Sequence, residues 1–137
     1  PMNRRQFLAT SAAAVAVAPA AFAATAYTPG LVEAELAAGK TVFLDFKASW
    51  CSTCAAQERV INALKSANPA YAQAISFINV DWDTYKSADL TKRLNIPRRS
   101  TLVVLKGDQE LGRIVAGTGQ AEIKALMDTA LAAATSA

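Results

Sequence analysis

The only two cysteines of this 137-residue chain lie three residues apart, in Trp50-Cys51-Ser52-Thr53-Cys54. An apolar run over residues 42–46 precedes them, and apolar residues at helical spacing follow them. A strand that leads into a helix beginning at Cys51 places that sulfur at a helix N-terminus. Unpaired N–H groups and the helix dipole favour a thiolate there. The spacing therefore predicts a redox-active dithiol in which Cys51 is the nucleophile and Cys54 the resolving thiol.

Other uses of the cysteine pair are less well supported by the sequence. A disulfide between residues this close encloses too short a loop to stabilise a fold strongly. The chain has no histidine, the commonest metal ligand and general base, and no further cysteine to complete a zinc or iron–sulfur site. We therefore expect no metal and no cofactor. A metal shared between two chains stays open as an alternative.

The N-terminal segment has the pattern of an export signal. Arg4 and Arg5 precede an apolar stretch rich in small residues, which ends in Ala21-Phe22-Ala23. The paired arginines are typical of the twin-arginine class of bacterial signals. A membrane anchor is the alternative, but the apolar stretch is short, alanine-rich and interrupted by Pro19. We expect residues 1–24 to be removed on export, which leaves a soluble periplasmic protein.

The remaining residues, 25–137, are expected to form one domain. The chain is 53% apolar and 18% charged, as in a globular protein. It carries 14 basic and 11 acidic side chains, and outside the predicted signal 12 basic ones balance the same 11 acidic ones. This near balance gives no indication of nucleic-acid binding.

Hydrophobic periodicity and turn residues predict eight elements in this domain. We expect helices over 31–38, 51–66, 86–94 and 120–133, and strands over 41–46, 75–80, 100–105 and 110–116. The predicted inner face of the second helix consists of Ala56, Val60, Ala63, Leu64 and Ala67. Helical crossovers suggest that the first three strands are parallel, and the final hairpin is antiparallel. The expected fold class is α/β, with helices on both faces of a central mixed four-stranded sheet.

Asp45 is unusual because it places a carboxylate within the apolar strand that leads to the cysteines. Burial of this group would be costly and would raise its pKa, so that it could accept a proton from the Cys54 thiol. Alternatively, Asp45 points to solvent and pairs with Lys47 or Lys40. Strand alternation does not decide between the two interpretations.

Three segments together resemble the thioredoxin family: Phe43-Leu44-Asp45-Phe46, the Trp50–Cys54 motif, and the run from Ser100 to Gly107. Within that family the chain is similar to the C-terminal periplasmic domain of the thiol–disulfide interchange protein DsbD. The resemblance extends over about residues 36–131 and implies a thioredoxin fold. It also implies that Asp45 is the buried proton acceptor. The lysine that often lies near this aspartate is replaced by Phe77.

The chain departs from the family pattern at Ser100, where the resemblance leads us to expect a cis-proline facing the cysteines. A cis bond before a non-proline residue costs about 2.5–4 kcal/mol. Arg99–Ser100 is therefore expected to be trans with a reshaped loop; a strained cis bond there, or a cis bond at Pro97, are the alternatives. The resemblance implies a substrate-binding surface formed by Trp50, Arg99, Ser100 and Gly117.

Arg98 and Arg99 are expected to lie across from Cys51, where their charge would favour its thiolate and acidic partners. They could instead be an ordinary solvated pair.

The predicted function is thiol–disulfide exchange with protein disulfides, more in the reducing than the oxidising direction. The resemblance implies a membrane thiol-electron donor of the DsbD or CcdA type, and we expect a monomer. The alternative is a non-catalytic thioredoxin-like binding module, or a dimer that shares a metal.

Overall fold

The computed structural model describes residues 23–136, so most of the predicted signal segment lies outside the described residues. Within that range, none of the helices combines the length and the apolar character needed to cross a membrane. The strands are β1 (Thr25–Ala26), β2 (Thr41–Lys47), β3 (Ser76–Asp81), β4 (Thr101–Lys106) and β5 (Gln109–Val115). The helices are α2 (Leu31–Ala37), α3 (Ser52–Ala67), α4 (Ala70–Ala74), α5 (Trp82–Tyr85), α6 (Asp89–Arg93) and α7 (Gln120–Thr135).

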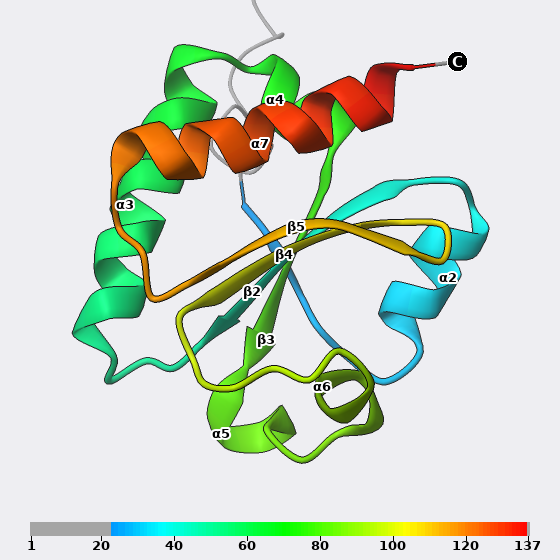
Figure 1. Ribbon diagram of the computed structural model, residues 1–137, viewed down its shortest axis with the longest axis vertical. Coiled ribbons are helices and arrows are strands. Elements are labelled where there is room, and N and C mark those ends of the chain that lie inside the picture. The colour runs from blue at the N-terminus through cyan, green and yellow to red at the C-terminus, as the bar shows by residue number, and fades with distance from the viewer. Residues whose placement is uncertain (1–22, 137) are drawn as a thin grey trace, which may run out of the picture.

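The strands form one mixed sheet in the order β1-β3-β2-β4-β5, with β2 at its centre (Figure 1). This confirms the predicted α/β class and its helix-covered mixed sheet. The sheet has one strand more than predicted. The additional strand is β1, which lies at the edge of the sheet and pairs with β3 through two residues. A two-residue strand is too short to show alternation in the sequence.

The predicted strand directions are correct for β2 and β3, which are parallel, and wrong for β4, which runs antiparallel to β2. The connection from β3 to β4 contains only the short helices α5 and α6. Helices of four and five residues are about 6–8 Å long, whereas a six-residue strand spans about 20 Å. These helices are too short to carry the chain back along the sheet. The strand β4 therefore starts at the end of the sheet where β3 finishes, and it runs in the opposite direction.

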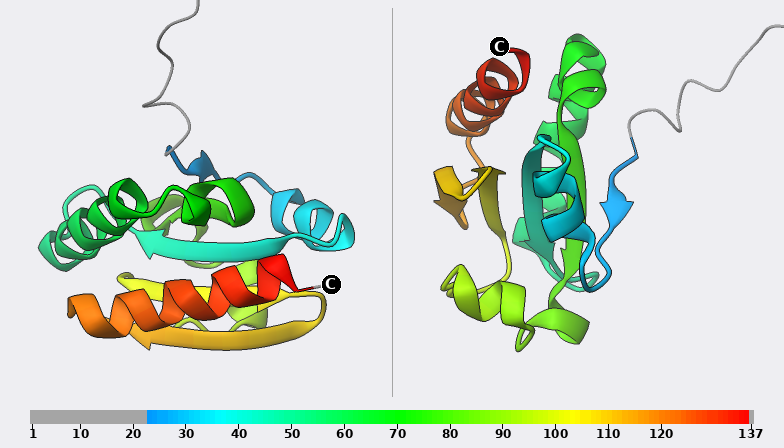
Figure 2. Two further views of the ribbon diagram at one scale, coloured as in Figure 1. Left: turned by 90° about the horizontal axis from the view of Figure 1, so that it is seen from above. Right: turned by 90° about the vertical axis from the view of Figure 1, so that its right-hand side faces the viewer.

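Helices cover both faces of the sheet, and each face has its own apolar core (Figures 1 and 2). On one face β2 contributes Val42, Leu44 and Phe46, which pack with residues of α2, α5 and α6. On the other face Phe43 packs with residues of α3, α4 and α7. Strand alternation places Asp45 on the same face as Phe43, below α3.

The predicted inner face of α3 is wrong: the buried face is rotated about the helix axis relative to the predicted one. Its buried residues are Cys54, Gln57, Ile61, Leu64 and Lys65. Of the predicted set, only Leu64 is buried. The predicted face was chosen because it contains several small alanines. Residues spaced three and four positions apart, starting from Cys54, form the observed face. The patterns also predict neither α4 nor α5, each of which has five residues or fewer.

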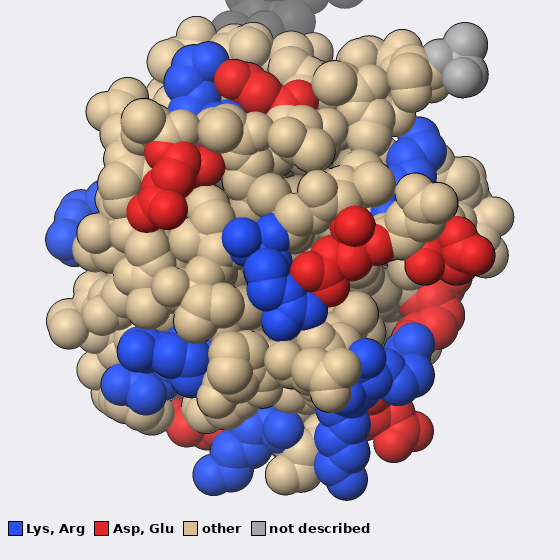
Figure 3. Space-filling view, viewed as in Figure 1, with Lys and Arg blue, Asp and Glu red and all other residues tan. Residues whose placement is uncertain are grey.

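Charged side chains of both signs are mixed on the face shown in Figure 3. Within β5, Arg113 pairs with Glu110. On α7, Lys124 pairs with Asp128 one turn later. The mixture matches the near balance of charge outside the predicted signal segment.

Candidate active site

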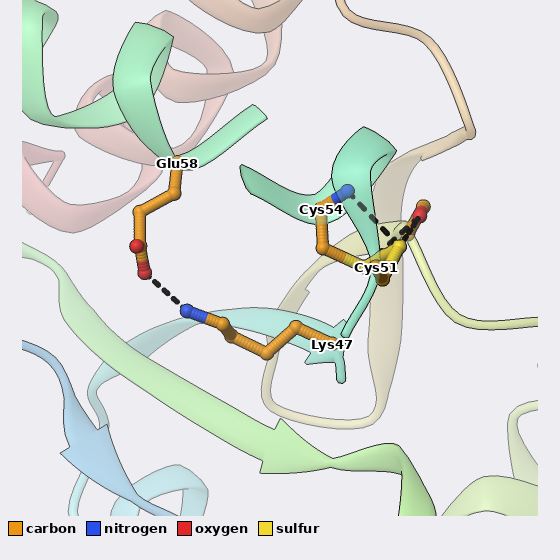
Figure 4. A network of polar contacts seen from close by, with 5 residues as sticks. Lys47, Cys51, Cys54 and Glu58 are labelled. Atoms are coloured by element: carbon orange, nitrogen blue, oxygen red, sulfur yellow. Dashed lines mark hydrogen bonds and ion pairs between the residues drawn. A yellow bond between two sulfur atoms is a disulfide. The ribbon is translucent and has the colours of Figure 1, made fainter. Parts of the chain in front are cut away.

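Cys51 and Cys54 form a disulfide at the start of α3, just after the end of β2 (Figure 4). Cys51 is the N-cap residue, and its Sγ accepts a hydrogen bond of 3.1 Å from the backbone N–H of Cys54. The Cα atoms are 5.2 Å apart, within the usual range for a disulfide. Only 5% of Cys51 and 1% of Cys54 is exposed. The first sulfur therefore sits where the helix N-terminus can stabilise a thiolate.

Ser100 faces both sulfurs from the loop before β4. Its Oγ lies 3.1 Å from the Sγ of Cys51 and 3.1 Å from the Sγ of Cys54, and the residue is fully buried. None of the peptide bonds among residues 23–136 is cis, so Arg99–Ser100 is trans, as expected. Ser100 has a φ of 64°, in the left-handed region that residues other than glycine seldom adopt. The loop is therefore reshaped around a trans serine.

Gln57 connects this loop to α3 and was not predicted as a site residue. Its Nε2 donates to the carbonyl oxygen of Ser100 at 3.0 Å and to that of Gly117 at 2.9 Å. The side chain is fully buried. Gln57 thus links the segments that precede β4 and follow β5 to the helix that carries the cysteines. Its position three residues after Cys54 was the only available signal.

Removal of the Gln57 amide should destabilise the protein. Gln57→Met keeps the side-chain volume but leaves two carbonyl contacts unmade, which should lower the free energy of unfolding by about 1–3 kcal/mol. Urea unfolding followed by circular dichroism measures this change. Gln73→Met, on an exposed position of α4, is the matched control and should have little effect. Equal changes in the two variants would contradict the bridging role.

Asp45 is buried below α3, with 5% of its surface exposed. Burial is the main cause that raises the pKa of its carboxyl to about 7; the nearby Glu58 adds to this shift, whereas Lys47 and Lys65 oppose it. Among the described residues its Oδ1 has no hydrogen-bond partner. The solvent-facing alternative is therefore wrong. Lys47 instead pairs with Glu58 of α3, as Figure 4 shows.

Asp45 lines a cavity of about 200 Å³ together with Glu58, Lys65 and Phe77. Phe77 lies opposite Phe43 in the β2–β3 register, and their ring centroids are 5.0 Å apart. The Lys65 Nζ, from α3, lies 3.9 Å from the centroid of the Phe77 ring. Burial lowers the pKa of Lys65, and the charge of Asp45 opposes that shift. A helix thus supplies the amine near Asp45 that the sequence lacks at position 77.

Trp50 precedes the dithiol and is 59% exposed. Its indole Nε1 donates to the carboxylate of Asp83, at 2.9 Å from Oδ2 and 3.1 Å from Oδ1. The guanidinium carbon of Arg99 lies 4.5 Å from the centroid of the Trp50 ring, in a cation–π contact. Asp83 was not predicted as a site residue, because it lies 33 positions away in sequence.

The other predicted surface residues lie close by. The Nε of Arg98 donates a hydrogen bond to the Arg99 carbonyl at 3.0 Å. Gly117 contributes its carbonyl oxygen to Gln57. The loops before β4 and after β5 therefore meet at α3. In residues 23–136, no three His, Cys, Asp or Glu side chains come together so as to hold a metal ion.

Comparisons with known proteins agree with this geometry. The chain is 35% identical over 77 residues to a thioredoxin H-type of Fagopyrum esculentum, covering 56% of this chain and 61% of that one. It is 31% identical over 96 residues to a thioredoxin of Coprinus comatus, covering 69% and 84%. The alignments span only 61% and 60% of two plant thioredoxins, those of Fagopyrum esculentum and Oryza sativa.

Solved structures show the same fold. The crystal structure of Trxlp from Edwardsiella tarda matches with a TM-score of 0.63 at 29% identity, covering 77% of this chain and 96% of that one. A Malassezia sympodialis thioredoxin matches with a TM-score of 0.66 at 22% identity, covering 80% and 91%. The thioredoxin family model matches residues 25–129, most of the domain described above. The chain therefore belongs to the thioredoxin family.

Proposed function

We propose that the protein is a thiol–disulfide oxidoreductase that exchanges electrons with protein disulfides through Cys51 and Cys54. The observation that carries this proposal is the disulfide at the start of α3, with Cys51 as N-cap and acceptor of the Cys54 N–H. Family membership supports it. An N-terminal sulfur with a donated hydrogen bond is the arrangement that stabilises a nucleophilic thiolate.

The proposed reaction proceeds in two exchange steps. The Cys51 thiolate attacks one sulfur of a substrate disulfide, a mixed disulfide forms, and the other substrate sulfur leaves as a thiolate. Cys54 then loses its proton and attacks the Cys51 sulfur, which releases the second substrate thiol. Two electrons pass to the substrate, and the Cys51–Cys54 disulfide remains. Burial raises the pKa of the Asp45 carboxyl to about 7, so part of it is ionised near neutral pH, and this carboxylate is proposed to accept the Cys54 proton.

We further propose that the reaction runs in the reducing direction in the periplasm, with electrons from a membrane thiol carrier of the DsbD or CcdA type. The twin-arginine pattern and the resemblance to the DsbD C-terminal domain support this. The exposed Trp50 indole, in contact with Arg99, is the proposed docking surface for the protein disulfide. The arginine would favour substrates that carry acidic groups beside the disulfide.

Insulin reduction in the presence of dithiothreitol tests the activity. Residues 25–137 should accelerate insulin precipitation above the dithiothreitol background, and the same protein alkylated in its reduced form should not. Equal rates would favour the binding-module alternative. Equilibration with glutathione tests the direction: a potential near about −270 mV fits a reductase, and one near about −120 mV fits an oxidant and would overturn the reducing assignment.

A further inference from the structure

The hydroxyl of Ser100 is placed between the two sulfurs. It lies 3.1 Å from each Sγ, and Ser100 is fully buried. A hydroxyl has one donor hydrogen, which rotates toward the stronger acceptor. Disulfide sulfurs are weak acceptors, whereas a thiolate is charged and forms a stronger, charge-assisted hydrogen bond. Reduction of the disulfide therefore creates an acceptor within reach of this donor.

The backbone of Ser100 is held independently of its hydroxyl. Its N–H donates to the Phe46 carbonyl at 2.7 Å, and its own carbonyl accepts from Ala116 N at 2.8 Å and from Gln57 Nε2 at 3.0 Å. These three bonds connect Ser100 to β2, to the end of β5 and to α3. They fix a residue whose φ of 64° is costly for a side chain other than glycine. The strained conformation is thus maintained in the place where the hydroxyl reaches both sulfurs.

We propose that Ser100 is a catalytic residue, and that its hydroxyl donates a hydrogen bond to whichever of the two sulfurs is the thiolate. This inference rests on the proposed dithiol function. In the reduced protein the hydroxyl donates to Cys51, alongside the Cys54 N–H. Once Cys51 is bonded to a substrate sulfur, the hydroxyl rotates to the Cys54 thiolate, which then attacks Cys51. Ser100 itself gains and loses no covalent bond.

A proline at this position could not act in this way, since it has no hydroxyl and no N–H. The serine therefore adds a donor that the expected proline lacks. Its effect has a definite sign: a donor to the Cys51 thiolate lowers the pKa of that thiol and stabilises the reduced protein. Stabilising the reduced form makes the disulfide more oxidising.

Two variants that lack the hydroxyl test the proposal, with the Cys51 pKa read from the ultraviolet absorbance of the thiolate. Ser100→Ala keeps a Cβ at a positive φ, whereas Ser100→Gly relieves the backbone strain. Both should raise the Cys51 pKa by about one to two units, because a hydrogen bond to a charged group is lost. Both should also lower the reduction potential, measured against glutathione. Ser66→Ala, at an exposed position of α3, is the control and should change neither.

Comparison of the two variants separates the effect of losing the hydroxyl from the effect of changing the backbone strain. An unchanged pKa in both variants, or a shift in Ser100→Ala but not in Ser100→Gly, would overturn the proposal. If Ser100→Ala does not fold, Ser100→Gly carries the test alone. Thiolate titration needs no substrate, so a protein inactive toward insulin still gives an answer for Ser100. If the wild-type protein reduces insulin and the Cys51 pKa is the same in both variants as in the wild type, the Ser100 role is rejected and the proposed function stands.

Discussion

Replacing Cys54 by serine is expected to give a protein that captures disulfide substrates and does not release them, whereas Cys51→Ser should abolish both capture and turnover. Cys51 occupies the N-cap of α3, where the Cys54 N–H reaches its sulfur at 3.1 Å. Cys54 lies one turn further along and is 1% exposed. Exchange with a substrate sulfur therefore takes place at Cys51. Cys54 can act only afterwards, on the mixed disulfide.

Non-reducing electrophoresis and mass spectrometry of reduced Cys54→Ser protein mixed with insulin would detect the mixed disulfide. Insulin turnover should fall to the dithiothreitol background in both single variants. The control is the double variant Cys51→Ser, Cys54→Ser, which should neither turn over nor form the adduct. Accumulation of the adduct on Cys54 in the Cys51→Ser protein would reverse the assigned roles.

The sequence was sufficient to predict the dithiol and its surroundings, since these are local. A buried strand, a short loop and a helix that begins directly after Cys51 are all encoded within 27 residues, from Thr41 to Ala67. The parts supplied by distant segments were harder to predict. Ser100 could be placed opposite the cysteines only through the family resemblance, and its contact with both sulfurs depends on a positive φ that no sequence pattern indicated.

The buried polar residues of α3 were also hard to predict, because their contacts are with distant segments. Gln57 and Lys65 would ordinarily be assigned to the solvent face of an amphipathic helix. They are buried because their partners come from elsewhere: the carbonyls of Ser100 and Gly117 for Gln57, and the Phe77 ring for Lys65. Before those segments are placed, helical spacing from Cys54 is the only signal that favours these positions over the alanines beside them.

Asp45→Asn is expected to stabilise the protein at alkaline pH and to have little effect near pH 4. Burial raises the pKa of the Asp45 carboxyl from its ordinary value near 4 to about 7. Between these two values the folded protein holds a proton that the unfolded chain has released. Stability therefore falls as the pH rises through this window, by about 4 kcal/mol for a shift of roughly three units. Above about pH 7 the full cost of a buried carboxylate is present.

An asparagine avoids this cost because it is neutral at every pH and similar in shape to the protonated acid. The difference in unfolding free energy between Asp45→Asn and the wild type should thus grow from pH 4 to pH 8 and then level off. Urea unfolding at several pH values measures it, with Asp108→Asn, exposed in the turn between β4 and β5, as the control. A difference that does not change with pH would show that Asp45 titrates like an exposed carboxyl. It would also remove the basis for assigning Asp45 the Cys54 proton, since an acceptor with an ordinary pKa would hold that proton poorly near neutral pH.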